Sequence, residues 1–356
     1  MAKSHDFFLS LENRRSHKLL VPAGTHVSKG GGALRLTLRP LVLLLGLALS
    51  GCATLPDISQ SRSPCQLEPG GWCGFVRDAA VEAWPYAVAS TNAYTGDDDL
   101  FAKPGRVLQR IEHLPIAPED ADKGFSYELF NQYAPGSGGD AARKPVARVL
   151  AFRGTDLKGL SDIFFGTLRG DQIALALRYF NAERARLGDD LPWVVTGHSL
   201  GGALATEVSD AHPEVRAFMF NTSPFYRNEV RANALRRTVF NERGEFLRRF
   251  ARNDEPPAAN VFTINCEPRK NAIVKHKVRP LADCITWIAA YASTDAQAVV
   301  SANGIAKPLV ECGPDDKAHP GPGSKPNEPC VHNSLRKDKP KGKDKDQSET
   351  GAAAGQ

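Results

Sequence analysis

The chain has 356 residues, of which 42% are hydrophobic and 24% are charged. These fractions are typical of a globular protein and exclude a chain that is disordered throughout. The formal net charge of +5 is modest, and the sequence holds neither a paired CxxC zinc pattern nor a glycine-rich phosphate loop followed by lysine. We therefore expect no nucleic-acid partner, no metal and no other cofactor.

The N-terminal segment has the pattern of a secretory signal. Residues 41–49 (LVLLLGLAL) form a short apolar core behind Arg35 and Arg39. The next residues, Leu49-Ser50-Gly51-Cys52, resemble a bacterial lipobox, which implies cleavage before Cys52 and acyl chains on that residue. Each buried CH₂ group contributes about 0.8 kcal/mol to membrane binding. We expect residues 1–51 to be leader and signal peptide, residues 52–70 a lipidated tether, and the location to be the cell envelope, with Ala53 indicating the outer membrane.

The central part of the chain alternates between strand and helix patterns. Apolar runs predict strands at residues 124–133, 146–152, 193–196, 217–221, 237–241 and 260–266, with the first two joined by a hairpin loop. Helical spacing predicts helices at residues 75–94 (broken near Pro85), 168–187, 200–212, 245–252 and 279–293. This alternation predicts an α/β domain over residues 71–335, with a mostly parallel sheet and helices on both faces. Residues 336–356 are charged, lack large apolar side chains and are predicted to be a disordered tail.

A nucleophile motif lies between a predicted strand and a predicted helix. Gly197-His198-Ser199-Leu200-Gly201 follows the apolar run LPWVVT and precedes a helix of small residues. A Gly-x-Ser-x-Gly motif in that setting is the nucleophile elbow of the α/β-hydrolase fold. The two glycines keep the strand and the helix free of Cβ clashes around a strained serine. We therefore predict that Ser199 is a catalytic nucleophile.

Two longer motifs resemble the class 3 (fungal-type) lipase family. They are TGHSLGGALA around Ser199 and VLAFRGTD upstream of it, and the segment ASTNAY is similar to the end of the family's first helix. The resemblance covers about residues 75–295 and implies an α/β-hydrolase fold with ester-hydrolysing activity. It also implies an oxyanion hole made by Thr155 and by the backbone N–H of Leu200.

The catalytic base is expected in the loop that follows the last strand. In α/β-hydrolases the chain order is serine, acid, histidine, and catalytic groups lie at the carboxyl ends of parallel strands. His276 lies about ten residues after the strand NVFTINC, in a basic polar segment before an apolar helix. His332, in the cysteine-containing segment near the C-terminus, is the alternative.

The catalytic acid has three candidates. Glu242 and Glu245 directly follow the strand at 237–241 and are at the correct end of the sheet. Glu245 has a spacing closer to that of the family's acid, whereas Glu242 is nearer to the strand. Asp254 resembles the family's acid in its local sequence, but a helix at 245–252 would place it at the opposite end of the sheet. The sequence favours the two glutamates and leaves the choice between them open.

Six cysteines remain after Cys52, an even number that suggests disulfides in an exported protein. On proximity in the chain alone, the expected pairs are Cys65–Cys73, Cys266–Cys284 and Cys312–Cys330.

These features predict a membrane-anchored serine hydrolase that cleaves carboxylic esters of lipids, of lipase or phospholipase A type. The expected partners are an ester or lipid substrate and, through Cys52, a membrane; the oligomeric state is left open. Ile163, Phe164 and Phe165 follow the predicted oxyanion loop and could line an acyl pocket, belong to a lid or pack in the core. The alternatives are an esterase for small esters and an envelope lipoprotein that keeps the fold as a scaffold without catalysis.

Overall fold

The computed structural model describes residues 63–94, 100–136, 143–154, 168–223, 233–250, 259–311 and 321–322. The chain divides into two compact units, Met1–Thr54 and Leu55–Gln356, and all described residues lie in the second. The predictions for the signal peptide, for Cys52 and for the tail therefore fall outside the described residues. Among the residues that the structure describes, no helix is long and apolar enough to cross a membrane.

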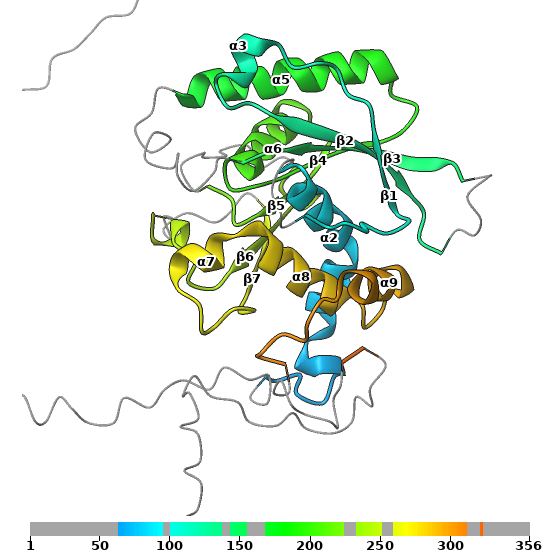
Figure 1. Ribbon diagram of the computed structural model, residues 1–356, viewed down its shortest axis with the longest axis vertical. Helices are drawn as coiled ribbons and strands as arrows, with labels where there is room; N and C mark the ends of the chain where they lie inside the picture. Colours follow the sequence, from blue (N-terminus) through cyan, green and yellow to red (C-terminus); the bar gives the residue numbers. More distant parts are fainter. Residues whose placement is uncertain are drawn as a thin grey trace, which may run out of the picture. The chain divides into compact units, whose positions relative to one another are not determined.

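A seven-stranded sheet forms the centre of the second unit, and its spatial order is the chain order β1 to β7 (Figure 1). Strands β1 to β3 pair antiparallel, and β3 to β7 pair parallel. The predicted mostly parallel sheet, with helices on both faces as in the α/β-hydrolase fold, is confirmed. The strands are β1 (Leu108–Ile111), β2 (Tyr127–Tyr133), β3 (Pro145–Phe152), β4 (Trp193–His198), β5 (Arg216–Phe220), β6 (Arg237–Glu242) and β7 (Asn260–Ile264).

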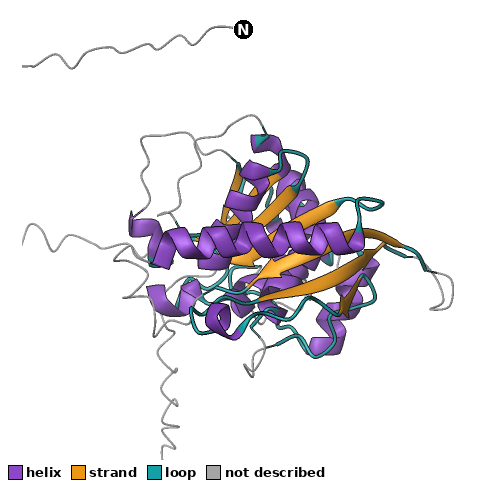
Figure 2. Cartoon of the chain, turned by 90° about the horizontal axis from the view of Figure 1, so that it is seen from above, coloured by secondary structure: helices purple, strands orange, loops and turns teal. Residues whose placement is uncertain are grey.

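The strand order decides which helices cover which face. Crossovers between parallel strands are right-handed, so the two helices that connect β3 to β4 and β4 to β5 must lie on the same face. These are α5 (Leu168–Leu187) and α6 (Leu200–Ala211), and Figure 2 shows the strands passing beneath the long α5. The opposite face is covered by α2 (Gly74–Asn92) and α8 (Val278–Ala289). In the chain, α2 precedes the first strand and α8 follows the last one.

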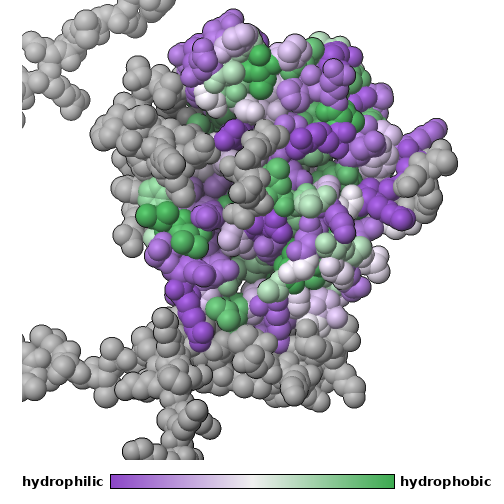
Figure 3. Space-filling model, in the orientation of Figure 1, coloured by the Kyte–Doolittle hydropathy of each residue, from purple (hydrophilic) through white to green (hydrophobic). Residues whose placement is uncertain are grey.

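Two hydrophobic clusters fill these two layers. Along β3, Val149 and Ala151 join the cluster under α2 and α8, whereas Leu150 and Phe152 join the cluster under α5 and α6. Alternate side chains of a strand point to opposite faces, so a strand buried on both faces needs an unbroken apolar run. On the face seen in Figure 3, hydrophilic side chains predominate and hydrophobic ones form small, separate patches.

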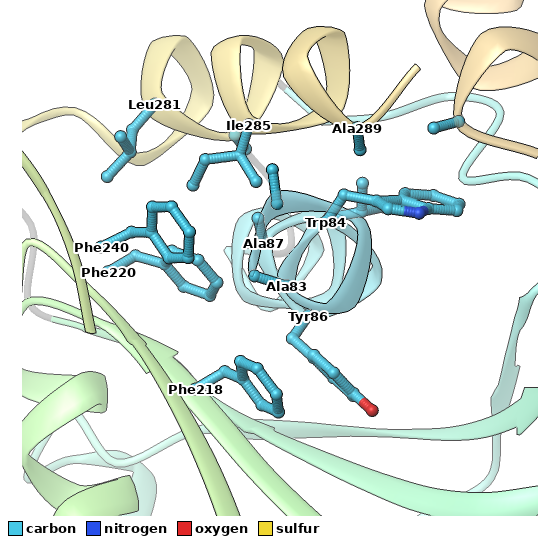
Figure 4. Close-up of a cluster of buried hydrophobic side chains, with 14 of the residues drawn as sticks. Ala83, Trp84, Tyr86, Ala87, Phe218, Phe220, Phe240, Leu281, Ile285 and Ala289 are labelled. Carbon is cyan, nitrogen blue, oxygen red and sulfur yellow. The ribbon is translucent and has the colours of Figure 1, made fainter. Parts of the chain in front are cut away.

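Helix α2 lies between the sheet and α8 (Figure 4). Small residues on α2, including Ala83 and Ala87, are fully buried and allow the close approach of α8. The predicted break at Pro85 is wrong, because the helix runs through it from Gly74 to Asn92. Packing of the neighbouring side chains opposes the cost of the proline. Tyr86, for example, stacks on Phe218 with ring centroids 4.1 Å apart and donates a hydrogen bond to Gln132.

A buried carboxylate ties the segment before α2 to α8 and to the segment after α9 (Thr294–Asn303). Glu311 accepts hydrogen bonds from the indole N–H of Trp72 (3.0 Å) and of Trp287 (2.6 Å), and from the hydroxyl of Tyr291. Burial raises the pKa of Glu311 to about 8. A Cβ at Gly70 would lie 2.8 Å from the carboxyl carbon of Glu311, so the chain passes close to this carboxylate.

Two of the three predicted disulfides are confirmed, Cys65–Cys73 and Cys266–Cys284. The third, Cys312–Cys330, lies outside the described residues. Where a helix over 245–252 was expected, the structure has a short 3₁₀ helix, η6 (Leu247–Phe250). Further short elements without a sequence prediction are η2 (Pro69–Gly71), α3 (Pro118–Ala121), η5 (Ala234–Arg236) and α7 (Ala272–His276).

Candidate active site

Ser199 occupies a strained turn between β4 and α6. Its backbone has φ 57° and ψ −120°, a region that non-glycine residues rarely adopt. A Cβ on Gly197 would lie 2.2 Å from the carbonyl carbon of Gly201, and a Cβ on Gly201 would lie 2.2 Å from the carbonyl oxygen of Phe152. The backbone N–H of Ser199 donates to Phe220, and its carbonyl accepts from Ser223. The tight turn therefore requires both glycines and is held by the neighbouring strand β5.

The structure brings Ser199, His276 and Glu245 together. Nε2 of His276 lies 3.0 Å from Oγ of Ser199, and Nδ1 of His276 lies 2.9 Å from Oε2 of Glu245. All three side chains are buried. A carboxylate can only accept, so Nδ1 carries the proton and Nε2 is the acceptor for the serine hydroxyl. This is the arrangement of a nucleophile, a general base and an orienting acid.

Glu245 uses one oxygen for two hydrogen bonds. Oε2 accepts from His276 and also from the backbone N–H of Leu247, at 2.8 Å. The other oxygen, Oε1, is buried and has no hydrogen-bond partner within the described part of the chain. The same oxygen of Glu245 thus binds both the histidine and the loop after β6, and the hydrogen bond from Leu247 in that loop holds this oxygen next to Nδ1 of His276.

The other candidates for the acid and the base are placed differently. Glu242 does not pair with His276; its two oxygens accept from the backbone N–H groups of Cys266 (2.8 Å) and Glu267 (3.0 Å). Burial raises the pKa of Glu242 to about 7. Asp254 and His332 lie outside the described residues.

The histidine itself does not lie in a loop, as the sequence suggested, but at the end of the short helix α7. Asn271 caps the start of this helix by accepting from the N–H groups of Ile273 and Val274. A capping asparagine favours the start of a helix, but five residues are too few to produce a periodic pattern in the sequence.

His198, the middle residue of the Gly-x-Ser motif, contacts the backbone of His276. Its Nε2 lies 2.6 Å from the carbonyl oxygen of His276, and its Nδ1 lies 2.8 Å from the hydroxyl of Tyr94. A carbonyl can only accept, so Nε2 carries the proton and Tyr94 donates to Nδ1. Burial, with the nearby His276, holds the pKa of His198 well below its usual value, so this ring is neutral. Sequence reasoning missed both Tyr94 and His198 because neither role has a local pattern.

Of the two expected donors of the oxyanion hole, the structure describes Leu200 but not Thr155. The N–H of Leu200 is the first in α6, and an N–H in the first turn of a helix has no partner within the helix and lies at the positive end of its dipole. Thr155 lies outside the described residues, but Gly154 before it is described. A Cβ on Gly154 would lie 2.4 Å from the carbonyl oxygen of His198 and 3.3 Å from Cβ of Ser199. The segment that leads to Thr155 therefore passes directly against the elbow.

No group of three or more His, Cys, Asp or Glu side chains within the described residues could hold a metal ion. A cavity of about 490 Å³ is lined by residues that include Tyr86, Gln132 and Arg216. Arg216 is the first residue of β5, whereas Ser199 follows the end of β4. The cavity is therefore at the opposite end of the parallel strands from Ser199.

Comparison with known proteins gives weak likenesses to fungal lipases. The lipase of Rhizomucor miehei, in a propeptide complex, is 14% identical, with 57% of this chain and 76% of that chain covered and a TM-score of 0.36. The lipase of Rhizopus microsporus var. chinensis is 16% identical, with 62% and 92% covered and a TM-score of 0.36. Lipase II of Rhizopus niveus is 15% identical, with 47% and 73% covered and a TM-score of 0.33. No family model and no curated protein matches. The fold assignment therefore rests on the strand order and the elbow.

Proposed function

We propose that this protein is a serine hydrolase of carboxylic esters, with Ser199 as nucleophile, His276 as general base and Glu245 as the acid of the triad. The observation that carries the proposal is the imidazole of His276, which bridges the hydroxyl of Ser199 and the carboxylate of Glu245 inside a buried site. The strained elbow supports it, because backbone strain of this kind persists where function requires it.

The geometry gives a mechanism in two halves. Neutral His276 takes the proton of Ser199 as Oγ attacks the ester carbonyl carbon, and the resulting imidazolium gives that proton to the leaving alcohol when the acyl–oxygen bond breaks. Water then gives a proton to His276 as its oxygen attacks the carbonyl carbon of the acyl-enzyme. The imidazolium returns that proton to Oγ of Ser199 when the acyl–Oγ bond breaks, which releases the carboxylic acid. Glu245 keeps the proton on Nδ1 and stabilises the imidazolium.

The oxyanion of each tetrahedral intermediate needs donors beside Ser199. The N–H of Leu200 is one candidate, and a donor from Thr155 is the other. Removal of one such donor typically costs about 3 kcal/mol of transition-state stabilisation.

We further propose that the substrates are lipid esters and that acylated Cys52 holds the enzyme at a membrane of the cell envelope, with the outer membrane as its site. The support is the lipobox-like Leu49-Ser50-Gly51-Cys52 and the two motifs that resemble class 3 lipases. Ile163, Phe164 and Phe165, the candidates for an acyl pocket, lie outside the described residues. An esterase for small esters is the alternative.

A fluorophosphonate probe tests the catalytic proposal. The wild-type protein should be labelled and Ser199→Ala should not. The control Ser209→Ala should be labelled like the wild type, because Ser209 is a buried serine at the far end of α6 whose hydroxyl donates a hydrogen bond to the carbonyl of Val215. Absence of labelling in the wild type, or labelling of Ser199→Ala, would favour the non-catalytic scaffold.

Two further assays test the substrate and the anchor. Nitrophenyl esters of increasing chain length, together with phospholipid vesicles, separate a lipase from an esterase for short esters. Radioactive palmitate should label the wild-type protein in cells but not Cys52→Ser, and that variant should leave the membrane fraction.

A further inference from the structure

Helix α7, which carries His276, cannot hold its own position. It has five residues, Ala272–His276, and isolated helices shorter than about 12 residues are marginal in water. The last carbonyl groups of any helix also lack partners within the helix. In α7 the carbonyl groups of Lys275 and His276 are in this position. Contacts with other elements must therefore hold the imidazole of His276 in place.

Asn221 supplies such contacts from the end of β5. Its side-chain N–H₂ donates to the carbonyl oxygens of Lys275 (3.1 Å) and His276 (3.3 Å), and its Oδ1 accepts from the backbone N–H of Glu242 (2.8 Å). The residue is fully buried and has φ 43°, a left-handed conformation that asparagine tolerates better than most residues. One amide therefore joins the helix that carries the base to the strand that leads to Glu245.

The second contact comes from the elbow itself. Nε2–H of His198 donates to the same carbonyl oxygen of His276 at 2.6 Å. His198 directly precedes Ser199, and Asn221 follows β5, the strand whose Phe220 binds the N–H of Ser199. The two donors thus fix the backbone of His276 relative to the two strands that fix Ser199.

We propose that Asn221 is a positioning residue that acts through His276, with His198 as the second donor to the same carbonyl; this inference rests on the proposed serine hydrolase function. The chemistry requires an amide at this position. Oδ1 must accept while Nδ2 must donate, and a carboxylate of the same shape would turn a second oxygen toward two carbonyl oxygens. A displacement of about 1 Å between reacting groups can reduce a rate by about 100-fold.

The test compares two variants of Asn221 with a matched control. Asn221→Asp keeps the shape and removes the donor, whereas Asn221→Gly removes the side chain and accepts the positive φ without strain. The control is Asn233→Ala, because Asn233 is also a buried asparagine that donates to a backbone carbonyl, that of Ser209, and accepts from Arg237, but it lies in the segment before β6. We measure kcat for a nitrophenyl ester per serine titrated by the fluorophosphonate, and KM separately.

Both Asn221 variants should lose about 10- to 100-fold in kcat per titrated serine, with KM changed less than twofold. Asn233→Ala should lower the melting temperature and leave kcat per titrated serine unchanged. In a His276→Ala background, where Ser199 no longer titrates and the residual rate is measured per mole of folded protein, Asn221→Gly should cost no further activity, because the group through which it acts is gone. If one Asn221 variant fails to fold, the other decides.

Full kcat per titrated serine in a folded Asn221 variant, or an equal loss in the His276→Ala background, would overturn this inference and leave the proposed function standing. A wild-type protein that neither hydrolyses esters nor labels at Ser199 would overturn both.

Discussion

Replacing Glu245 with glutamine would remove one negative charge from the proposed triad and leave its shape in place. In the structure Oε2 of Glu245 accepts from His276 and from Leu247, while Oε1 has no partner within the described residues. The glutamine oxygen can therefore take the place of Oε2, and its N–H₂ group can occupy the place of Oε1 without displacing a hydrogen bond. The variant isolates the effect of charge on the imidazolium of His276.

The size of that effect follows from Coulomb's law. The two charge centres lie about 4 Å apart, and at an effective dielectric constant of about 20 they attract each other by about 4 kcal/mol. A change of 1.36 kcal/mol in the barrier is tenfold in rate. We therefore expect kcat/KM of Glu245→Gln to fall by about 1000-fold.

The assay is nitrophenyl ester hydrolysis per titrated serine, with Glu242→Gln as the matched control. In that control one acceptor oxygen becomes an N–H₂ group facing the backbone N–H of Cys266 or Glu267. It should lose about 1–3 kcal/mol of folding stability and keep kcat/KM within about threefold, because Glu242 does not touch His276. A loss below tenfold in Glu245→Gln, or a larger loss in Glu242→Gln, would refute the assignment of the acid.

Three further changes have defined outcomes. Replacing Cys266 and Cys284 with alanine opens a loop of 18 residues that contains the base; the chain-entropy model gives a loss of about 3 kcal/mol, and an unchanged urea midpoint would contradict it. Glu311 has a pKa of about 8 in the folded state, against 4.5 for the free group. Below about pH 4.5 the group is protonated in both the folded and the unfolded state, so the shifted pKa does not affect stability. As the pH rises from there toward 8 only the unfolded state loses the proton, and the free energy of unfolding is about 3 kcal/mol lower at pH 7. Glu311→Gln should flatten that dependence in chemical denaturation, and an equal slope would count against the shifted pKa. Tyr94→Phe removes the hydroxyl that donates to Nδ1 of His198. We expect a loss of about tenfold in kcat/KM and of about 1–3 kcal/mol in folding stability, because a buried acceptor loses its donor; wild-type kinetics would exclude a role of Tyr94 in positioning His198.

The sheet and the elbow could be predicted because their signals are local. A strand buried on both faces must be apolar throughout, as at 146–152 and 193–196, and a tight strand-to-helix turn must contain glycine. The edge strand β1 has no such run, since the middle two of its four residues, Gln109 and Arg110, are exposed. Its sequence therefore resembles a loop. The continuous α2 was missed for the opposite reason, because a local rule about proline was outweighed by packing with distant residues.

The part of the candidate site that could be predicted is the part that follows from the order of the strands. The order of serine, acid and histidine along the strands selected His276 and narrowed the acid to two glutamates. The choice between them depends on one turn after β6, where Gly244 has φ 79° and the N–H of Glu245 returns to the carbonyl of Glu242. That turn sends Glu245 to the histidine and leaves Glu242 on backbone amides. Asn221 and His198 act across 55 and 78 residues, and a single sequence carries no signal for such contacts.

The hydrogen bonds of Glu311 determine how far the chain can be truncated at each end without loss of buried contacts. Trp72 lies 239 residues before it in the chain, ahead of α2, and Glu311 lies beyond α9. A fragment trimmed to the elements around the sheet, from Gly74 to Asn303, would lose both and leave the indole of Trp287 and the hydroxyl of Tyr291 without the oxygens that they bind. A fragment that lost only Trp72 would keep the buried carboxyl group of Glu311 with two hydrogen-bond partners instead of three. The shortest stable fragment should therefore extend from Cys65, with its disulfide to Cys73, to Glu311.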